Sequence, residues 1–515
     1  MAGSLVEKKT ERNDKIYEIL CSIVGSRRVS TDPEELYLYS WSFVNATDKP
    51  GRCDYVVMPE TVEEVQQIVK TANIYKIPIT AAVSQLNFGG VATPRTGGIY
   101  IDLRKMNRVL EVDEDSMYAL IEGGTTWSDL KGYLDKNYPD LVVGITWSPP
   151  GTGVVPCALE SGFVDLSLLG GCLSEWINGL EVVLPTGEIV KTGVAAYTGG
   201  KRWFSRAPGP DITGLFIGWV GKMGIVTKMA IRLWPRMPRS YFALTADTYR
   251  RGVKAELAIC KAGGPMIGVC DMCSMNLCWN LSDWGSRPVQ FPVPDIDKYF
   301  VGDHVIIPEE AGIPDFYGLM HVAAATEEEM DAKVKKVFEV VKDCGVEIMA
   351  WEDQFKEGGP CWPKDKVGEA PLYSNMPLQE FGSWNYYGGG GGEWDGAFLP
   401  WDLVATYYEE CRKEALKVKR HCGYYNRVMS GGHYQYGRVQ IWHDKDDPKD
   451  VELASKLHRK FNEICMTLGG IRYKPQYWAT EAVSRRIDGV ALKLMHELRK
   501  LIDPNGIMNP GHGYF

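Results

Sequence analysis

Hydrophobic and polar residues follow two different spacings between about residue 20 and residue 235. At 61–75 (TVEEVQQIVKTANIY), apolar side chains recur at helical spacing after Thr61, a residue type that caps helices. Short apolar runs between glycine- and proline-rich turns predict strands. These strands are predicted at 99–103, 118–122, 180–184 and 225–232. The block is therefore expected to mix helices with sheets.

The pattern changes at Trp234–Pro238, where prolines interrupt it, and we place a domain boundary there. The next block contains amphipathic helices at 326–343 and 402–420 among strands and long loops. A helix predicted over 485–502 lies near the end of the chain. The sequence is thus divided into three parts: residues 1–238, 239–470 and 471–515.

Length and charge narrow the classes of function. A chain of 515 residues is too long for one ordinary core. Its formal charge of -9 argues against a nucleic-acid partner, because phosphate binding needs a basic face. The start of the chain lacks an apolar export signal, and no stretch is long and apolar enough for a membrane span. The 13 cysteines are therefore predicted to be reduced thiols in the cytoplasm.

Several common catalytic motifs are missing from the sequence. There is no GxxxxGK[ST] loop, no strand–GxGxxG–helix unit and no HExxH, so neither a nucleotide triphosphatase nor an ordinary nicotinamide enzyme is indicated. Cys270, Cys273 and Cys278 form a C-x2-C-x4-C run without a second tight pair, and we expect buried thiols there. No metal site is predicted.

Two glycine-rich turns are candidates for holding an anionic ligand. Residues 83–95 (VSQLNFGGVATPR) contain Gly89 and Gly90, and residues 149–155 (PPGTGVV) form a second turn. Where side chains are absent, consecutive backbone N–H groups can converge on a pyrophosphate. Taken alone, such a turn is more often an ordinary chain reversal than a ligand site.

The order and flanks of these turns resemble the PCMH-type FAD-binding domain of the vanillyl-alcohol oxidase and p-cresol methylhydroxylase family. The similar stretches lie at 87–130, 179–193 (GLEVVLPTGEIVKTG), 208–216 (PGPDITGLF), 221–235 (GKMGIVTKMAIRLWP) and 502–511 (IDPNGIMNPG). The resemblance implies an α+β fold. It would consist of an FAD-binding domain of two α/β subdomains and a cap domain with an antiparallel sheet flanked by helices.

The resemblance also assigns a cofactor site. The loop at 84–90 and the turn at 151–155 would hold the FAD diphosphate. Residues 224–226 would line the flavin, and the C-terminal segment at 509–511 would complete the pocket. The residues concerned are Ser84, Gln85, Leu86, Asn87, Phe88, Gly89, Gly90, Pro150, Gly151, Thr152, Val154, Gly224, Ile225, Val226 and Asn509. Non-covalent FAD is predicted, because the first loop lacks the histidine tether of some relatives and Trp394–Pro400 offers no obvious His or Tyr.

Arg472 is the first candidate for the active site. It lies in GGIRYKPQ, which aligns with a family stretch where a tyrosine and then an arginine sit beside the flavin and the substrate oxygen. A guanidinium there would stabilise negative charge. The family tyrosine is Ile471 here, and Tyr473 follows directly after Arg472. Without the resemblance, a surface ion pair would explain Arg472.

Further candidates come from the same comparison. Cys172 falls nearest to the position of an acidic catalytic residue of the family, and Glu175 is close to it in sequence. His433 precedes a strand that resembles one lining the family pocket, where an imidazole would accept a proton; a structural histidine is the alternative. Aromatic residues of the cap would stack on a flat substrate or fill the core. They are Trp384, Tyr386, Tyr387, Trp394, Tyr434, Tyr436, Trp442, Tyr477 and Trp478.

The sequence therefore predicts an FAD-dependent oxidoreductase. It would oxidise a small aromatic or ring-bearing alcohol, or an alkyl-phenol-like substrate, by hydride transfer to flavin N5. A D-2-hydroxy-acid dehydrogenase of the glycolate-oxidase type and a non-catalytic FAD-binding subunit are the alternatives. A small-molecule substrate is expected, while an electron-acceptor protein and a second copy of the chain stay open as partners.

Overall fold

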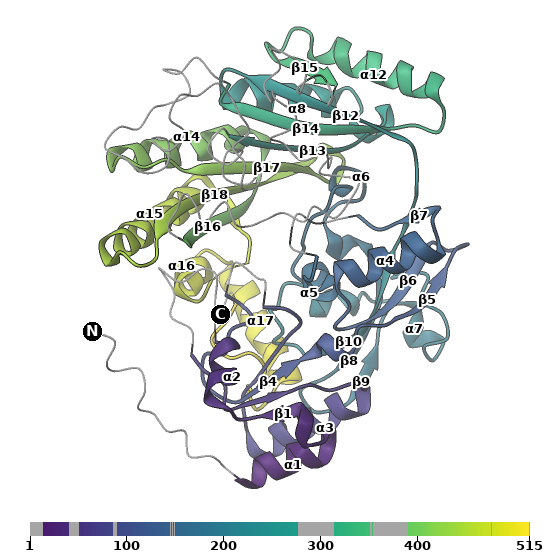
Figure 1. Cartoon of the computed structure of the whole chain (residues 1–515), viewed down its shortest axis with the longest axis vertical. Coiled ribbons are helices and arrows are strands. Elements are labelled where there is room, and N and C mark those ends of the chain that lie inside the picture. The colour runs from purple at the N-terminus through teal and green to yellow at the C-terminus, as the bar shows by residue number, and fades with distance from the viewer. Residues whose placement is uncertain are drawn as a thin grey trace.

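The computed structural model describes residues 14–40, 51–85, 90–144, 146, 148, 150–276, 314–350, 353, 390–474 and 476–513. Figure 1 shows the first part of the chain at the bottom, a large sheet with helices at the top, and the last part returning to the bottom. Among the described residues, no helix has the length and the apolar character that crossing a membrane requires.

A small mixed sheet forms the base of the N-terminal part. Its strands, in order, are β1 (Val29–Ser30), β2 (Tyr55–Val57), β4 (Ile99–Asp102) and β3 (Ile79–Ala82). Only β1 runs antiparallel to its neighbour. Helices α1 (Asp14–Val24) and α3 (Val62–Tyr75) cover its apolar residues. Helix α3 begins as predicted, because the Thr61 side chain accepts a hydrogen bond from the Glu64 N–H.

A second sheet is antiparallel throughout. Its strands, in order, are β5 (Val109–Asp113), β6 (Tyr118–Glu122), β10 (Ile225–Arg232), β8 (Ile177–Val183) and β9 (Ile189–Lys191). Strands β6 and β10 have the predicted bounds, whereas β8 begins at Ile177 rather than at residue 180. Helices α4 (Trp127–Asn137) and α5 (Val154–Leu159) pack their apolar residues into the core of this sheet.

Short elements connect the two sheets and lead out of them. They are α2 (Pro33–Leu38), β7 (Leu141–Val142), α6 (Ser167–Gly170), α7 (Val194–Tyr197) and β11 (Trp234–Pro235). The 3-10 turns are η1 (Ser26–Arg28), η2 (Leu103–Lys105), η3 (Leu173–Trp176), η4 (Thr213–Phe216), η5 (Gly264–Ile267), η8 (Ser430–Gly432) and η9 (Tyr477–Ala479).

The cap is built on one large antiparallel sheet. Its strands, in order, are β15 (Glu347–Ala350), β12 (Arg239–Ala246), β14 (Phe316–Ala323), β13 (Val269–Asn276), β17 (Gly423–Met429), β18 (Tyr434–Asp444), β16 (Gly390–Leu399) and β19 (Ile471–Arg472). Its helices are α8 (Tyr249–Lys261), α12 (Glu327–Val341), α14 (Trp401–Lys417) and α15 (Pro448–Leu468), which share one apolar core with it (Figure 1).

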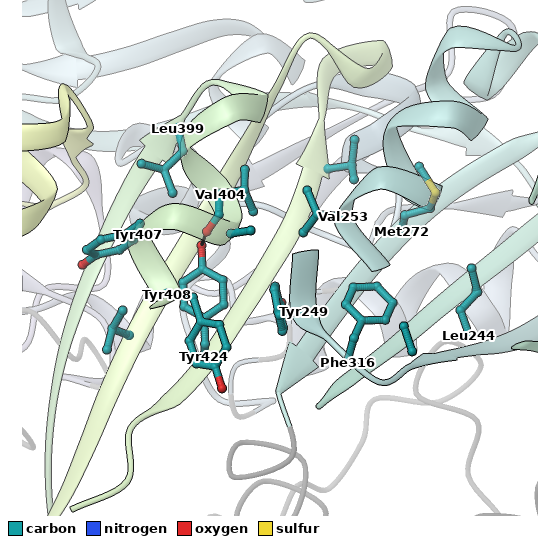
Figure 2. Packing of buried hydrophobic residues seen from close by; sticks show 14 of the residues in the cluster. Leu244, Tyr249, Val253, Met272, Phe316, Leu399, Val404, Tyr407, Tyr408 and Tyr424 are labelled. Carbon is teal, nitrogen blue, oxygen red and sulfur yellow. Dashed lines mark hydrogen bonds between the residues drawn. The ribbon is translucent and has the colours of Figure 1, made fainter. Parts of the chain in front are cut away.

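Tyrosines fill the core between these helices and the sheet (Figure 2). Tyr408 and Tyr424 stack with their ring centroids 5.2 Å apart, and Tyr249 meets Tyr424 edge-on at 5.1 Å. The Tyr424 hydroxyl donates a hydrogen bond to the Val404 carbonyl oxygen at 2.9 Å, so a polar group inside the core is satisfied. These rings hold the cap together and are not available to a substrate.

The observed architecture confirms the predicted α+β class and the antiparallel cap sheet with its helices. The helix predicted over 485–502 is observed as α17 (Gly489–Ile502), which begins four residues later and is preceded by a separate short helix, α16 (Thr480–Ser484). The break lies at Asp488, whose side chain accepts the first N–H groups of α17 and so starts a new helix. The boundaries of the three predicted parts stay predictions.

A carboxyl group is buried between α8 and the cap sheet. Glu256 accepts hydrogen bonds from the Ser274 hydroxyl and from the side-chain amides of Asn426 and Gln435, the latter two at 3.1 and 3.3 Å. Burial raises the pKa of Glu256 to about 7, against the smaller opposing effect of these hydrogen bonds. The folded protein therefore favours the neutral acid at this position.

This raised pKa predicts a dependence of stability on pH. Since the ordinary pKa of 4.5 rises to about 7 in the folded state, protonation of Glu256 favours folding fully below about pH 4.5, and this contribution is lost as the pH rises through 7. Glu256→Gln cannot ionise. We expect it to match the wild type near pH 5 and to exceed its stability near pH 8 by about 2–3 kcal/mol. Denaturant unfolding at both pH values measures this difference.

Glu497→Gln, which changes an exposed carboxylate on α17, is the matched control and should show no such trend with pH. An equal stability difference between Glu256→Gln and wild type at both pH values would contradict the prediction.

Candidate active site

One cavity lies where the N-terminal sheets, the cap sheet and the C-terminal segment meet. The N-terminal part contributes the end of β3, the start of α5 and the loop that precedes β10. The cap contributes one residue each from β16, β17 and β18. Tyr473, Lys474 and Asn509 come from the last part of the chain. All three predicted parts are thus needed to complete the walls.

Glycines let the backbone approach the cavity on its N-terminal side. Gly221 and Gly224 have φ values of 74° and 143°, which L-residues with a side chain rarely adopt. A Cβ atom at Gly224 would lie 2.7 Å from the Val183 carbonyl oxygen, and one at Gly153 would lie 2.9 Å from Val83. The wall is therefore packed too closely at Gly153 and Gly224 to hold a side chain there.

The polar groups of this wall fit a ligand that accepts and donates hydrogen bonds. The Thr152 hydroxyl oxygen is buried in the lining and has no hydrogen-bond partner among the described residues. Leaving such a group unsatisfied costs about 1–3 kcal/mol, which a bound ligand would recover. Beside it, apolar residues such as Val155 and Ile225 provide flat contacts. This combination suits the diphosphate and the rings of FAD.

Asn509 fastens the C-terminal segment over this wall. Its side-chain amide donates hydrogen bonds to the Val91 and Val220 carbonyl oxygens at 3.1 and 2.7 Å. Its backbone N–H donates to the Ile79 carbonyl oxygen at 2.7 Å. Asn509 thus joins the start of β3 to the loop before β10, and Asn509 and Val220 themselves line the cavity.

The cap side of the cavity is aromatic. Phe163, Trp394, Tyr425 and Tyr473 line it, and Tyr436 lies directly behind them. The rings of Phe163 and Tyr436 are 4.3 Å apart, and Tyr473 meets Tyr436 edge-on at 5.2 Å. Burial holds the pKa of Tyr473 well above its ordinary value, so its hydroxyl stays a hydrogen-bond donor.

Three charged residues line the cavity near these rings: Arg438, Lys474 and Glu160. The guanidinium of Arg438 lies 4.6 Å from the centroid of the Trp394 ring, and its Nε donates a hydrogen bond to the Tyr436 hydroxyl at 2.8 Å. Burial lowers the pKa of Lys474, the second cation of the lining. Glu160 is the only carboxylate among the described lining residues, and burial raises its pKa to about 7.

The predicted cofactor residues divide into three groups. Those that line the cavity are Ser84, Gln85, Thr152, Gly224, Ile225, Val226 and Asn509. Those that are described but do not line it are Gly90, Pro150, Gly151 and Val154. Leu86, Asn87, Phe88 and Gly89 lie outside the described residues. Val154 turns into the core of the second sheet because it lies on the inner face of α5.

Arg472 faces away from the cavity. Its guanidinium forms a buried ion pair with Asp395 at 2.5 Å and lies 4.8 Å from the centroid of the Trp478 ring. Because successive residues of an extended strand point to opposite sides, Tyr473 enters the cavity instead. Lys474 follows it, so the expected order of a tyrosine and then a cation occurs two residues later, with lysine in the place of arginine.

Three other catalytic candidates also stand apart from the cavity lining. The Cys172 thiol contacts the Ser174 hydroxyl at 3.1 Å and the Glu175 carboxylate at 3.4 Å, at the start of η3. Glu175 is exposed, and its carboxylate accepts the Cys172 N–H. His433 is exposed in the turn between β17 and β18. Cys172 and Glu175 thus contact each other, and the catalytic roles assigned to these three residues stay predictions.

The candidate aromatic residues have different surroundings. Trp394 lines the cavity, Tyr436 supports it, and Tyr477 is 53% exposed. Trp478 packs against His458, outside the lining. Outside the described residues lie Trp384, Tyr386, Tyr387 and Cys278. Within the described part of the chain, no group of His, Cys, Asp and Glu is arranged to hold a metal ion.

The Thr152 hydroxyl provides a test of the cofactor wall. Thr152→Val removes the buried hydroxyl but keeps the shape of the side chain. We expect the dissociation constant for FAD to rise by about 3- to 10-fold, because one neutral hydrogen bond contributes about 1 kcal/mol. Fluorescence titration of the apoprotein with FAD measures it. Thr152→Ser should bind like wild type, and equal affinity in the valine variant would contradict the assignment.

The position of Arg472 predicts a defect in folding rather than in substrate binding. Arg472→Met leaves the Asp395 carboxylate buried without its cation, which costs about 3–5 kcal/mol of stability. Replacing Asp395 by leucine in the same chain should recover part of the loss. Thermal unfolding of the three proteins measures this effect. A normal melting temperature together with lost flavin reduction would instead place Arg472 in the active site.

Two protein families and several proteins of known function are similar to this chain in sequence. The families described as FAD binding domain and as FAD linked oxidases, C-terminal domain, match residues 53–193 and 389–512. The flavoprotein subunit of 4-cresol dehydrogenase (hydroxylating) from Pseudomonas putida is 26% identical over 508 residues, which cover 95% of this chain and 93% of that protein. A D-lactate dehydrogenase from Anaerostipes hadrus is 24% identical over 480 residues, covering 90% and 89%.

A solved structure shares the fold over nearly the whole chain. The isoeugenol complex of 4-ethylphenol oxidase from Gulosibacter chungangensis superposes with a TM-score of 0.84 at 20% identity, covering 98% of each chain. The walls of the cavity fall within the two matched regions, except for the part formed by Val220, Gly221 and residues 224–226. The chain therefore belongs to the vanillyl-alcohol oxidase and p-cresol methylhydroxylase family of FAD-dependent oxidoreductases.

Proposed function

We propose that the substrate is a small aromatic or ring-bearing alcohol, or an alkyl-phenol-like compound. The observation that carries this proposal is the aromatic lining at the cap end of the cavity, from Phe163, Trp394, Tyr425 and Tyr473. Rings of this kind bury a flat apolar substrate and exclude water from it. When bound, FAD would accept a hydride from the substrate at flavin N5.

The protein would orient the substrate and stabilise charge on its oxygen. Arg438 is held by the Tyr436 hydroxyl and by the Trp394 ring, so its charge is fixed at the cavity wall. Lys474 adds a second positive charge, and the Tyr473 hydroxyl is a donor beside it. Negative charge that develops on a substrate oxygen would be favoured here.

The same two cations favour a second candidate, a 2-hydroxy acid whose carboxylate they would bind. A D-lactate dehydrogenase is among the relatives of similar length. Non-covalent attachment of FAD and a cytoplasmic location stay predictions from the sequence alone, and an electron-acceptor protein and a second copy of the chain stay open as partners.

Anaerobic reduction of the bound flavin separates these candidates. The FAD-loaded protein is mixed with 4-alkylphenols and benzylic alcohols in one series, and with glycolate and D-lactate in another. Loss of the flavin absorbance with the first series alone is expected. Loss with the hydroxy acids alone would favour the second candidate, and no bleaching by any donor would favour a non-catalytic subunit.

Arg438 should contribute to substrate affinity. Arg438→Met removes a charged hydrogen-bond donor, which contributes about 1.5–3 kcal/mol, so we expect KM to rise by about 10- to 100-fold. Steady-state kinetics with the donor that bleaches the flavin measures it. The matched control is Arg459→Met, because Arg459 also stacks on a tryptophan, Trp478, but does not line the cavity. Equal KM values for the two variants would contradict the assigned role.

A further inference from the structure

Glu160 lines the cavity, although no sequence motif predicts it there. It caps the C-terminal end of α5, and its Oε1 atom accepts a hydrogen bond from the Val220 N–H at 2.9 Å. Val220 belongs to the loop that leads to the predicted flavin-contacting residues 224–226. The carboxylate therefore lies between the cofactor wall and the cap side of the cavity.

The groups that face Glu160 come from several elements. Tyr473 and Lys474, which follow β19, interact electrostatically with Glu160, and Lys474 interacts in turn with Cys157 on α5 and Arg438 on β18; all of them line the cavity. The charge of Lys474 lowers the pKa of Glu160, while burial, the larger effect, raises it to about 7. In return, the charge of Glu160 offsets part of the lowering of the Lys474 pKa by burial and adds to the effect by which burial raises the pKa of Tyr473. Glu160 is thus coupled to both residues at the substrate end.

We infer that Glu160 is the general base of the reaction and that the positive charge of Lys474 favours its carboxylate form. This inference rests on the proposed function. The O–H bond of a substrate alcohol breaks and its proton goes to a Glu160 oxygen, while the electron pair of that bond forms the new C=O bond. The C–H bond breaks at the same carbon, and its hydrogen leaves with both electrons to the oxidised FAD. Proton and hydride together account for the two hydrogens lost.

A carboxyl group with a pKa of about 7 suits this task, because a base is most effective when its pKa lies close to the working pH. Such a perturbed group in a cavity is a candidate for catalysis. A merely structural role, the acceptance of the Val220 N–H, can be separated from this one. Glu160→Gln keeps an acceptor oxygen for Val220 but cannot take up a proton.

The pH dependence of anaerobic flavin reduction tests the inference. For wild type, we expect the rate constant to rise about tenfold per pH unit below about pH 7 and to level off above it. Glu160→Gln should lose this dependence and slow reduction by about 10²- to 10⁴-fold. Glu160→Asp should keep the rise with pH and recover part of the rate. Glu188→Gln, an exposed carboxylate in the turn after β8, is the matched control and should behave like wild type.

Lys474 gives a second set of variants. Lys474→Met should move the midpoint of the wild-type profile to higher pH, because the carboxylate loses a nearby positive charge. Lys474→Arg should leave the midpoint in place. If the profile persists in Glu160→Gln and disappears in Lys474→Met, the lysine is the base and the inference is overturned.

A readout without turnover follows the protonation of Glu160 itself. The thermal midpoint of wild type relative to Glu160→Gln should fall as the pH rises through 7, because the folded state favours the protonated acid. A constant difference would overturn the inference. An unchanged pH profile in Glu160→Gln, measured with a donor that reduces the flavin, would also overturn the inference. That result would leave the proposed function intact. Failure of every donor to reduce the wild-type flavin would instead overturn both.

Discussion

The structure depends on the return of the chain from the cap to the sheet at its beginning. Ile79 of β3 donates its N–H to the Ile507 carbonyl oxygen and accepts the Asn509 N–H, both at 2.7 Å. The Asp503 carboxylate accepts the N–H groups of Ile507 and Met508, so this segment keeps its shape. Without this closure, residues that follow β19 would have no fixed position opposite the N-terminal wall. The cavity is therefore a product of long-range closure and not of either part alone.

Much of the fold could be predicted from the sequence, because helices and strands are specified largely by residues that are close together in the chain. Helix α3 and strands β6 and β10 are specified by periodicity and flanking turns, which the sequence displays directly. The side of a strand that faces a cavity depends on pairing. Tyr473 donates its N–H to the Gly396 carbonyl oxygen at 2.7 Å, and Arg472 pairs with Ala397. This register, set by a strand far away in sequence, determines which neighbour enters the cavity.

In the candidate site, too, local sequence features could be predicted, whereas features set by long-range contacts could not. Its glycine-rich turns were predicted, because a backbone that approaches a ligand closely requires glycine wherever it occurs. Arg438 and Lys474 were missed, since a cation on a strand or after it carries no local signal of its role. Glu160 was missed because the end of a short helix is an ordinary place for a glutamate. For these three residues, function follows from what other parts of the chain bring near them.

Burial raises the pKa of three carboxyl groups, Glu160, Glu256 and Asp271, to about 7. Glu256 is enclosed by side-chain donors, and Asp271 lies 3.3 Å from Arg427 with both side chains fully buried. Neither can meet a substrate. A raised pKa therefore reports exclusion from water, which packing alone produces. Only for Glu160 does the same effect occur at a wall that a ligand can reach, and there it becomes a chemical property of the site.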